Sequence, residues 1–257
     1  MRRLVVNADD FGLTDGICRG IVYAMDHGVV RATTAMTRPP GAADRIAAHA
    51  GTLSGRMGIH FQLTGGHPPC LPPGEVPTLV TPEGVFARKR MDIGEVSADE
   101  LRREWRAQLE FMRSRGVEPS HMDTHHHVHK RPDVFPVYLE FARELGIPAR
   151  ATNPDMAAAL RAAGVPCADA FITHFFGEDL SPERFLDLVD AAFADLPDTA
   201  VVELMCHPGH SDAELSAITA YSAAREREIA VLTSAEVRRG LGKMGIAVAG
   251  MEAVAAK

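Results

Sequence analysis

A run of histidines in the middle of the chain contains the residue types best suited to chemistry. Residues 121–129 read His-Met-Asp-Thr-His-His-His-Val-His. Each buried imidazole needs a partner for at least one ring nitrogen, and a metal ion is such a partner. The run lies inside the chain, which argues against a purification tag and leaves a solvated loop as the alternative. Because histidine-rich tracts usually bind metal, we expect a metal or catalytic site here, with further ligands elsewhere in the chain.

Two adjacent carboxylates follow the first predicted strand. Residues 4–6 are a short apolar run, and Asp9 and Asp10 come soon after it. In α/β folds the carboxyl ends of strands are where chemistry takes place. Adjacent side chains of an extended segment point to opposite sides, so we expect Asp9 and Asp10 to have different roles. The alternative is helix capping, but Thr14 or Asp15 already provides a cap for the helix that follows.

Two more histidines lie in or after predicted strands. His60 alternates with apolar neighbours in residues 57–63, and His207 follows the apolar run 201–206. A lone strand histidine is more often structural than catalytic, but here other candidate ligands also lie at strand ends. Glu203 shares a face with His207 on an ideal strand. There it could orient His207 or a substrate hydroxyl, or serve as a buried structural carboxylate.

Asp10, His60 and His125 are the residues that we expect to hold the metal. All three lie at or near the ends of predicted strands, which converge on one mouth in a barrel. Two imidazoles and one carboxylate with an open position form a catalytic metal site that can acidify a bound water. Zinc suits this ligand set best, and magnesium, manganese, iron and cobalt are left open. His129 could replace His125 as the ligand if this segment is helical.

Asp9 and His207 are the candidates for proton transfer. Asp9 is the neighbour of a predicted ligand, so it can accept a proton from a metal-bound water. His207 lies at another strand end and can donate a proton to a leaving group. These are the roles of a catalytic base and a catalytic acid.

The elements that position these residues alternate between strands and helices. The predicted strands are 4–6, 32–37, 57–63, 120–123, 149–152, 170–174, 201–207 and 229–232. The predicted helices are 17–25, 42–50, 101–112, 133–145, 157–163, 182–194 and 235–241, with Trp105 in the core. This alternation favours a mostly parallel sheet, and specifically an irregular (β/α) TIM-like barrel. We expect a single domain over residues 1–257, in which the Gly- and Pro-rich loop 64–92 covers the substrate.

Composition restricts the classes of partner. The formal net charge of -7 argues against nucleic-acid or anionic membrane partners, so we expect a small neutral substrate. Cys18, Cys70, Cys167 and Cys206 have no CxxC spacing, which fits a reducing cytoplasm rather than a disulfide framework. The first apolar run is too short for a signal peptide or a membrane span. The sequence leaves open whether the protein forms a homodimer.

Four motifs resemble those of the YdjC-like carbohydrate deacetylases. They are residues 7–12 (Asn-Ala-Asp-Asp-Phe-Gly), 58–61 (Gly-Ile-His-Phe), 121–129 and 203–208 (Glu-Leu-Met-Cys-His-Pro), and the similarity covers nearly the whole chain in order and spacing. The resemblance implies an irregular barrel, a divalent metal held by Asp10, His60 and His125, and Asp9 as catalytic base. It also implies an N-acetylated sugar as substrate, such as a chitooligosaccharide, with acetate released. His207 is assigned as general acid mainly from its position, and the loop 64–92, which matches no family pattern, leaves the exact sugar open.

Two other functions fit parts of the pattern. A metal-dependent phosphoesterase on a related barrel also uses strand-end Asp and His ligands and pairs such as His125 with His127. Against this function, such sites commonly hold several metals and need positive charge for phosphate, whereas the only basic cluster near the run is Lys130-Arg131. A non-catalytic protein that binds metal or carbohydrate would keep the ligands, but it would need neither Asp9 nor His207.

Overall fold

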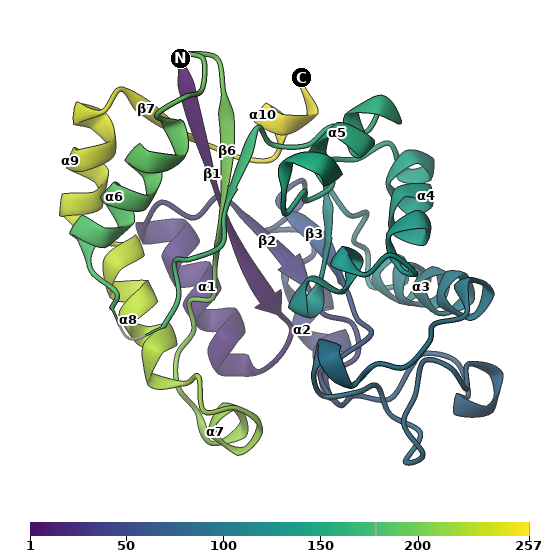
Figure 1. Ribbon diagram of the computed structural model, residues 1–257. Coiled ribbons are helices and arrows are strands. Elements are labelled where there is room, and N and C mark those ends of the chain that lie inside the picture. The colour runs from purple at the N-terminus through teal and green to yellow at the C-terminus, as the bar shows by residue number, and fades with distance from the viewer. Residues whose placement is uncertain (178, 257) are drawn as a thin grey trace.

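A curled parallel sheet forms the centre of the molecule. The computed structural model describes residues 1–177 and 179–256, and in this part seven strands form one sheet in the order β4-β3-β2-β1-β6-β5, with β7 also paired to β1. Their bounds are β1 (Arg2–Phe11), β2 (Ala32–Ala35), β3 (Met57–Phe61), β4 (Met122–Thr124), β5 (Ala170–Ile172), β6 (Val201–Cys206) and β7 (Ile246–Ala249). All pairings are parallel. The sheet curls into a half-barrel, so the predicted irregular barrel is confirmed (Figure 1).

β1 is the central strand because three others pair with it. β6 pairs along one edge, while the other edge is shared by β7 near its start and by β2 near its end. Leu4, Val5 and Val6 are fully buried, as expected for a parallel strand that is covered on both faces. The carboxyl end of β1, which carries Asp9 and Asp10, therefore lies in the middle of the sheet.

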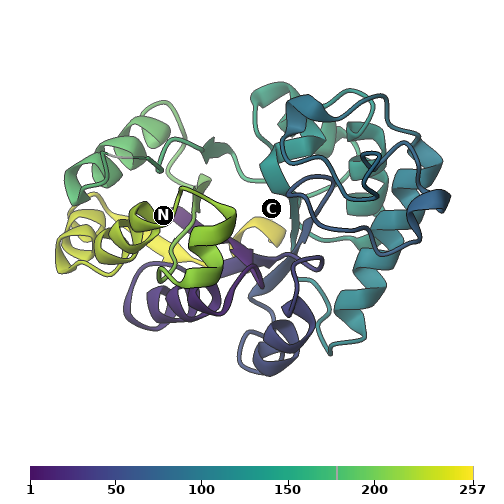
Figure 2. The same ribbon diagram turned by 90° about the horizontal axis from the view of Figure 1, so that it is seen from below.

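Helices surround the sheet on both sides. α1, α6, α8 and α9 lie to the left of the strands in Figure 1, and α3, α4 and α5 lie to the right; Figure 2 views the same arrangement from below. The bounds are α1 (Asp15–His27), α2 (Ala42–His49), α3 (Ala98–Arg113), α4 (Phe135–Leu145), α5 (Pro154–Ala162), α6 (Pro182–Phe193), α7 (Ala213–Ile218), α8 (Ala223–Leu232), α9 (Ala235–Lys243) and α10 (Glu252–Ala255). None of the described helices is both long and apolar enough to cross a membrane.

Several helix starts and one core residue agree with the sequence-based expectations. Thr14 caps α1 by accepting a hydrogen bond from the backbone of Ile17, and Ser97 caps α3 in the same manner. Trp105 of α3 is fully buried and stacks on Phe61 at 4.8 Å between ring centroids. α3 thus packs against β3, the strand that carries His60.

Two predicted strands are wrong, and one strand was not predicted. Residues 229–232 end α8, where Ile229, Val231 and Leu232 are buried. Residues 149–152 make only a single bridge, between Ala149 and Met122. The last strand is instead β7, at residues 246–249. Short apolar runs have the same composition in a buried helix turn and in a buried strand, so their periodicity does not distinguish the two.

Candidate metal centre

A backbone irregularity places both carboxylates of β1 at the same cavity. The φ angle of Asp10 is 71°, in the left-handed region, and the register between β1 and β2 shifts between Ala8 and Phe11. Such a bulge interrupts the alternation of side chains along a strand. Asp9 and Asp10 consequently line one cavity, contrary to the expectation that they point to opposite sides. A non-glycine residue in this conformation is strained, and strain of this kind clusters at functional sites.

Asp10, His60 and His125 bring three ligand atoms together. Asp10 Oδ1 lies 3.6 Å from His60 Nε2 and 3.3 Å from His125 Nδ1, and the two ring nitrogens are 3.3 Å apart. The ligand atoms of a tetrahedral zinc, each about 2.0–2.1 Å from the metal, lie about 3.4 Å from one another. The triangle therefore has the dimensions of one face of such a site, and its chemistry fits a divalent metal with an open position.

His60 is oriented by a carboxylate on the next strand. Its Nδ1 lies 2.5 Å from Asp123 Oδ1, so in the tautomer that donates this hydrogen bond the lone pair of Nε2 faces Asp10 and His125. Thr34 of β2 donates a hydrogen bond to the other oxygen of Asp123 (3.1 Å). A histidine ligand held by a carboxylate is the usual arrangement in metal sites. Burial opposes a charge on His60, but Asp123, Asp9 and Asp10 outweigh burial and raise its pKa to about 9.

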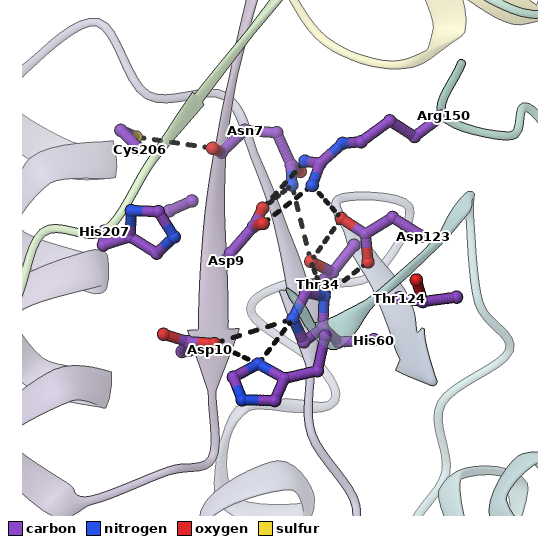
Figure 3. A network of polar contacts seen from close by, with 12 residues as sticks. Asn7, Asp9, Asp10, Thr34, His60, Asp123, Thr124, Arg150, Cys206 and His207 are labelled. Atoms are coloured by element: carbon purple, nitrogen blue, oxygen red, sulfur yellow. Dashed lines mark hydrogen bonds and ion pairs between the residues drawn. The ribbon is translucent and has the colours of Figure 1, made fainter. Parts of the chain in front are cut away.

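Arg150 joins the buried carboxylates behind the three ligands (Figure 3). Both terminal nitrogens of its guanidinium bond to Asp9 at 2.7 Å, one also lies 2.8 Å from Asp123, and Nε donates to Glu203 at 2.7 Å. Burial disfavours the charge on Asp9, but Arg150 outweighs it and holds the pKa of Asp9 well below its usual range. Glu203 is thus a structural partner of Arg150. Asp9, His60 and Asp123 also form a potential ligand group, but Arg150 already supplies its positive charge.

A second arginine fixes the other oxygen of Asp10. Nη2 of Arg225, from α8, donates to Asp10 Oδ2 at 2.7 Å, while Nε donates to the backbone carbonyl of Tyr221. Arg225 is only 6% exposed, so this ion pair is poorly screened by water. Burial raises the pKa of Asp10, but Arg225 outweighs burial and the pKa lies well below its usual range. Asp10 is thereby left with one oxygen, Oδ1, directed at the two histidines.

The histidine run makes a tight turn rather than a regular helix. His126 and His127 have φ angles of 53° and 49°, and the ring of His126 stacks on that of His125. His129 lies away from the ligand triangle: its Nδ1 bonds to Thr124 at 2.6 Å and its ring stacks on Tyr138. The structure therefore brings His125, and not His129, to Asp10 and His60.

His207 lies across the same cavity from the histidine run. Its backbone nitrogen donates to Glu228, and its ring meets that of Tyr221 at 6.2 Å between centroids. Nδ1 is buried without a hydrogen-bond partner in the described part of the chain. Burial lowers the pKa of His207 to about 4, with Asp10 opposing and Arg225 adding to this effect. The ring is therefore neutral at neutral pH.

The cavity that joins these groups has a volume of about 620 Å³. Its lining includes Asp9, Asp10, His60, His125 and His207. Lys89, Arg90 and Met91 of the predicted substrate-side loop also contribute to it. A second cavity of about 640 Å³ shares Asp10 and His125 with the first, but its lining does not include His60.

Sequence reasoning did not assign roles to three residues of this network. Asp123 lies within the histidine motif, but its part in orienting His60 depends on the register between β3 and β4. Arg150 could have been noticed as a lone cation between small apolar residues, a setting in which burial requires carboxylate partners. Arg225 lies 215 residues from Asp10 along the chain, and nothing in the local pattern indicates the contact.

Comparisons with known proteins match nearly the whole chain. The family model described as YdjC-like protein matches residues 3–243. A carbohydrate deacetylase of Geobacillus stearothermophilus is 36% identical over 95% of each chain. A chitooligosaccharide deacetylase of Serratia marcescens is 36% identical over 94% of this chain and 95% of its own. A solved structure of a protein from Enterococcus faecalis V583 is 32% identical, covers 98% of each chain and has a TM-score of 0.89.

Proposed function

The chain belongs to the YdjC-like family, and from this premise we propose that it removes an N-acetyl group from an acetylated amino sugar or short oligosaccharide, using one divalent metal ion. One observation carries the proposal: the cavity that contains the ligand triangle Asp10, His60 and His125 also contains Asp9 and His207. Both relatives named above are described as deacetylases of carbohydrates. A chitooligosaccharide-like substrate follows from the second of them.

Asp10, His60 and His125 are the proposed metal ligands. A divalent metal bound there would supply Lewis acidity, which acidifies water and polarises a carbonyl oxygen. The chain itself orients two of these residues, because Arg225 holds one oxygen of Asp10 and Asp123 holds His60. Zinc suits two imidazoles and one carboxylate best, and magnesium is the alternative.

Asp9 is the proposed base, which takes a proton from the water that attacks the acetamide carbonyl. Its low pKa keeps it ionised at neutral pH. A carboxylate has about four lone-pair positions, so the two hydrogen bonds from Arg150 and the one from Asn7 leave a position to accept this proton. The rigid pairing with Arg150 also keeps Asp9 in one orientation, as a catalytic group requires.

His207 is the proposed acid, which protonates the departing amine. Because its pKa is lowered to about 4, it must receive a proton during the reaction before it donates one. The proton taken up by Asp9, in the same cavity, is the source that keeps the proton count balanced. Acetate and the free amino sugar are the products.

A phosphoesterase is the second candidate function. It needs positive charge around its substrate, and Lys89, Arg90 and Lys130 all line the cavity. The experiment that separates the two compares acetate release from diacetylchitobiose and N-acetylglucosamine with phosphate release from p-nitrophenyl phosphate, each with zinc and with magnesium. We expect acetate release; phosphate release without acetate would replace the deacetylase by the phosphoesterase.

A further inference from the structure

Two large apolar side chains are exposed at the candidate active site. Among the described residues, Phe176 is 55% and Met91 84% exposed, and both line the cavity that contains Asp9 and His207. Phe176 follows β5 and Met91 belongs to the loop 64–92, so the two come from distant parts of the chain. Exposed apolar surface in a cavity with convergent polar groups is typical of a ligand-binding site.

Phe176 is held in place by Tyr221. The two ring centroids are 6.2 Å apart with an interplanar angle of 65°, an edge-to-face arrangement that aromatic pairs prefer. The hydroxyl of Tyr221 accepts a hydrogen bond from the backbone nitrogen of Gly177 (3.0 Å), the residue after Phe176. The segment that carries Phe176 is therefore attached to Tyr221, two residues before the start of α8, by both a ring contact and a hydrogen bond.

Tyr221 is in turn tied to the proposed catalytic groups. Its hydroxyl donates to Glu228 at 2.6 Å, and the other oxygen of Glu228 accepts the backbone N–H of His207. The guanidinium of Arg225, which holds Asp10, lies 5.5 Å from the centre of the Tyr221 ring. Phe176 thus has a fixed position relative to His207 and Asp10.

A pyranose ring suits such a surface. Its two faces present C–H groups, whereas its hydroxyls point outward in the plane, so one face can pack on an aromatic ring while the hydroxyls bond to water or to polar side chains. The ligand triangle is deep, with Asp10 3% and His60 2% exposed, whereas Phe176 is half exposed. The acetamide must reach the triangle, so a sugar ring on Phe176 lies farther out than the ring that carries the reacting group.

From this geometry we infer that Phe176 is a specificity-determining residue, the platform for the sugar ring next to the one that is deacetylated. The inference rests on the proposed function and restricts its substrate to sugars of at least two rings. Tyr221 acts as a positioning residue that holds the ring of Phe176 through their edge-to-face contact. Met91 lies in the same cavity and contributes apolar surface.

The test compares Phe176→Ala and Phe176→Tyr with the wild-type protein in acetate release from diacetylchitobiose. We expect Phe176→Ala to raise KM about tenfold while kcat stays within about twofold, because a stacking contact of this size binds substrate and transition state alike. Phe176→Tyr keeps the ring and should behave as wild type. Tyr23→Ala is the matched control, because Tyr23 is an exposed aromatic residue of α1 that does not line the cavity.

The outcomes separate the platform from the proposed function. An unchanged KM in Phe176→Ala, or a fall in kcat alone, overturns the platform and leaves the deacetylase standing. Wild-type protein that releases acetate from none of the acetylated sugars overturns the proposed function, and the platform with it. Thermal unfolding of each variant shows that the fold is intact.

Discussion

At the scale of single residues, two neighbouring carboxylates have different bonding partners and different proposed roles. Asp9 is bonded to Arg150, whereas Asp10 is bonded to Arg225 and faces His60 and His125. The two therefore have different electrostatic partners although they line one cavity. We therefore propose different roles for the two, proton acceptor for Asp9 and metal ligand for Asp10.

Asp9→Asn should abolish turnover without emptying the metal site. The amide has nearly the same shape but cannot take up the proton, and loss of a positioned base typically lowers the rate by about 10²–10⁴-fold. Metal content measured by atomic absorption should stay near that of the wild-type protein. Asp10→Asn is the matched control, in which metal and activity should fall together. If Asp9→Asn also lost its metal, Asp9 would be a ligand rather than the base.

The residue types at the site could be predicted from the sequence, but their connections could not. Asp10, His60 and His125 each lie in or just after a predicted strand, so strand ends indicated where they would meet. The left-handed backbone at Asp10 has no such signature, because a bulge depends on pairing with β2. Arg150 and Arg225 form their ion pairs over 141 and 215 residues, and only the fold determines such contacts.

At the scale of elements, β3 must approach β4 closely to bring His60 beside Asp123. Gly58 permits this approach, since a Cβ built there would lie 2.5 Å from the carbonyl oxygen of His121 and 2.7 Å from its ring. These distances are shorter than real Cβ contacts allow. The ladder between the two strands, and with it the His60–Asp123 hydrogen bond, depends on the missing side chain.

Gly58→Ala should lower both stability and metal affinity. Overpacking of this kind costs about 1–3 kcal/mol, and separation of β3 from β4 would displace His60 from Asp123. Denaturant unfolding and a zinc titration measure the two effects. Gly51→Ala is the control, since no atom lies within 4 Å of the corresponding Cβ. Equal stability and zinc affinity in both variants would show that the close approach does not matter.

Prediction of the elements succeeded where a cap or an alternating pattern defined them. Thr14, Ser97 and Ser181 each accept the capping hydrogen bond at the start of a helix. At residues 229–232 the only signal was a four-residue apolar run, which is equally compatible with a buried strand and a buried helix turn. In the structure these residues form the last turn of α8.

At the scale of the whole molecule, buried neutral histidines make stability depend on pH. His121 bonds to Asn7 through Nε2 and to Ser120 through Nδ1, and burial lowers its pKa from 6.5 to about 3. Between these two values only the unfolded chain takes up the proton. The contribution of His121 to the free energy of unfolding is therefore constant above pH 6.5 and falls as the pH decreases toward 3.

His121→Gln should make the free energy of unfolding less dependent on pH between pH 6 and 4. One proton corresponds to a slope of about 1.4 kcal/mol per pH unit, so the slope should decrease by up to this amount relative to wild type. Denaturant unfolding at pH 6, 5 and 4 in the presence of a chelator gives the slopes. His27→Gln, which replaces an exposed histidine, should leave the slope unchanged. If the free energy of unfolding of His121→Gln and of wild type changed with pH by the same slope, His121 would not be a neutral buried residue.

Deacetylation should require one divalent metal, held by Asp10, His60 and His125. The most direct measurement removes metal with a chelator, returns zinc or magnesium in known amounts and follows acetate release from diacetylchitobiose. This requirement predicts no release without metal, and a rate that rises in proportion to added metal and levels off at one equivalent per chain. Full acetate release by the metal-free protein, or a requirement for two equivalents, would contradict it.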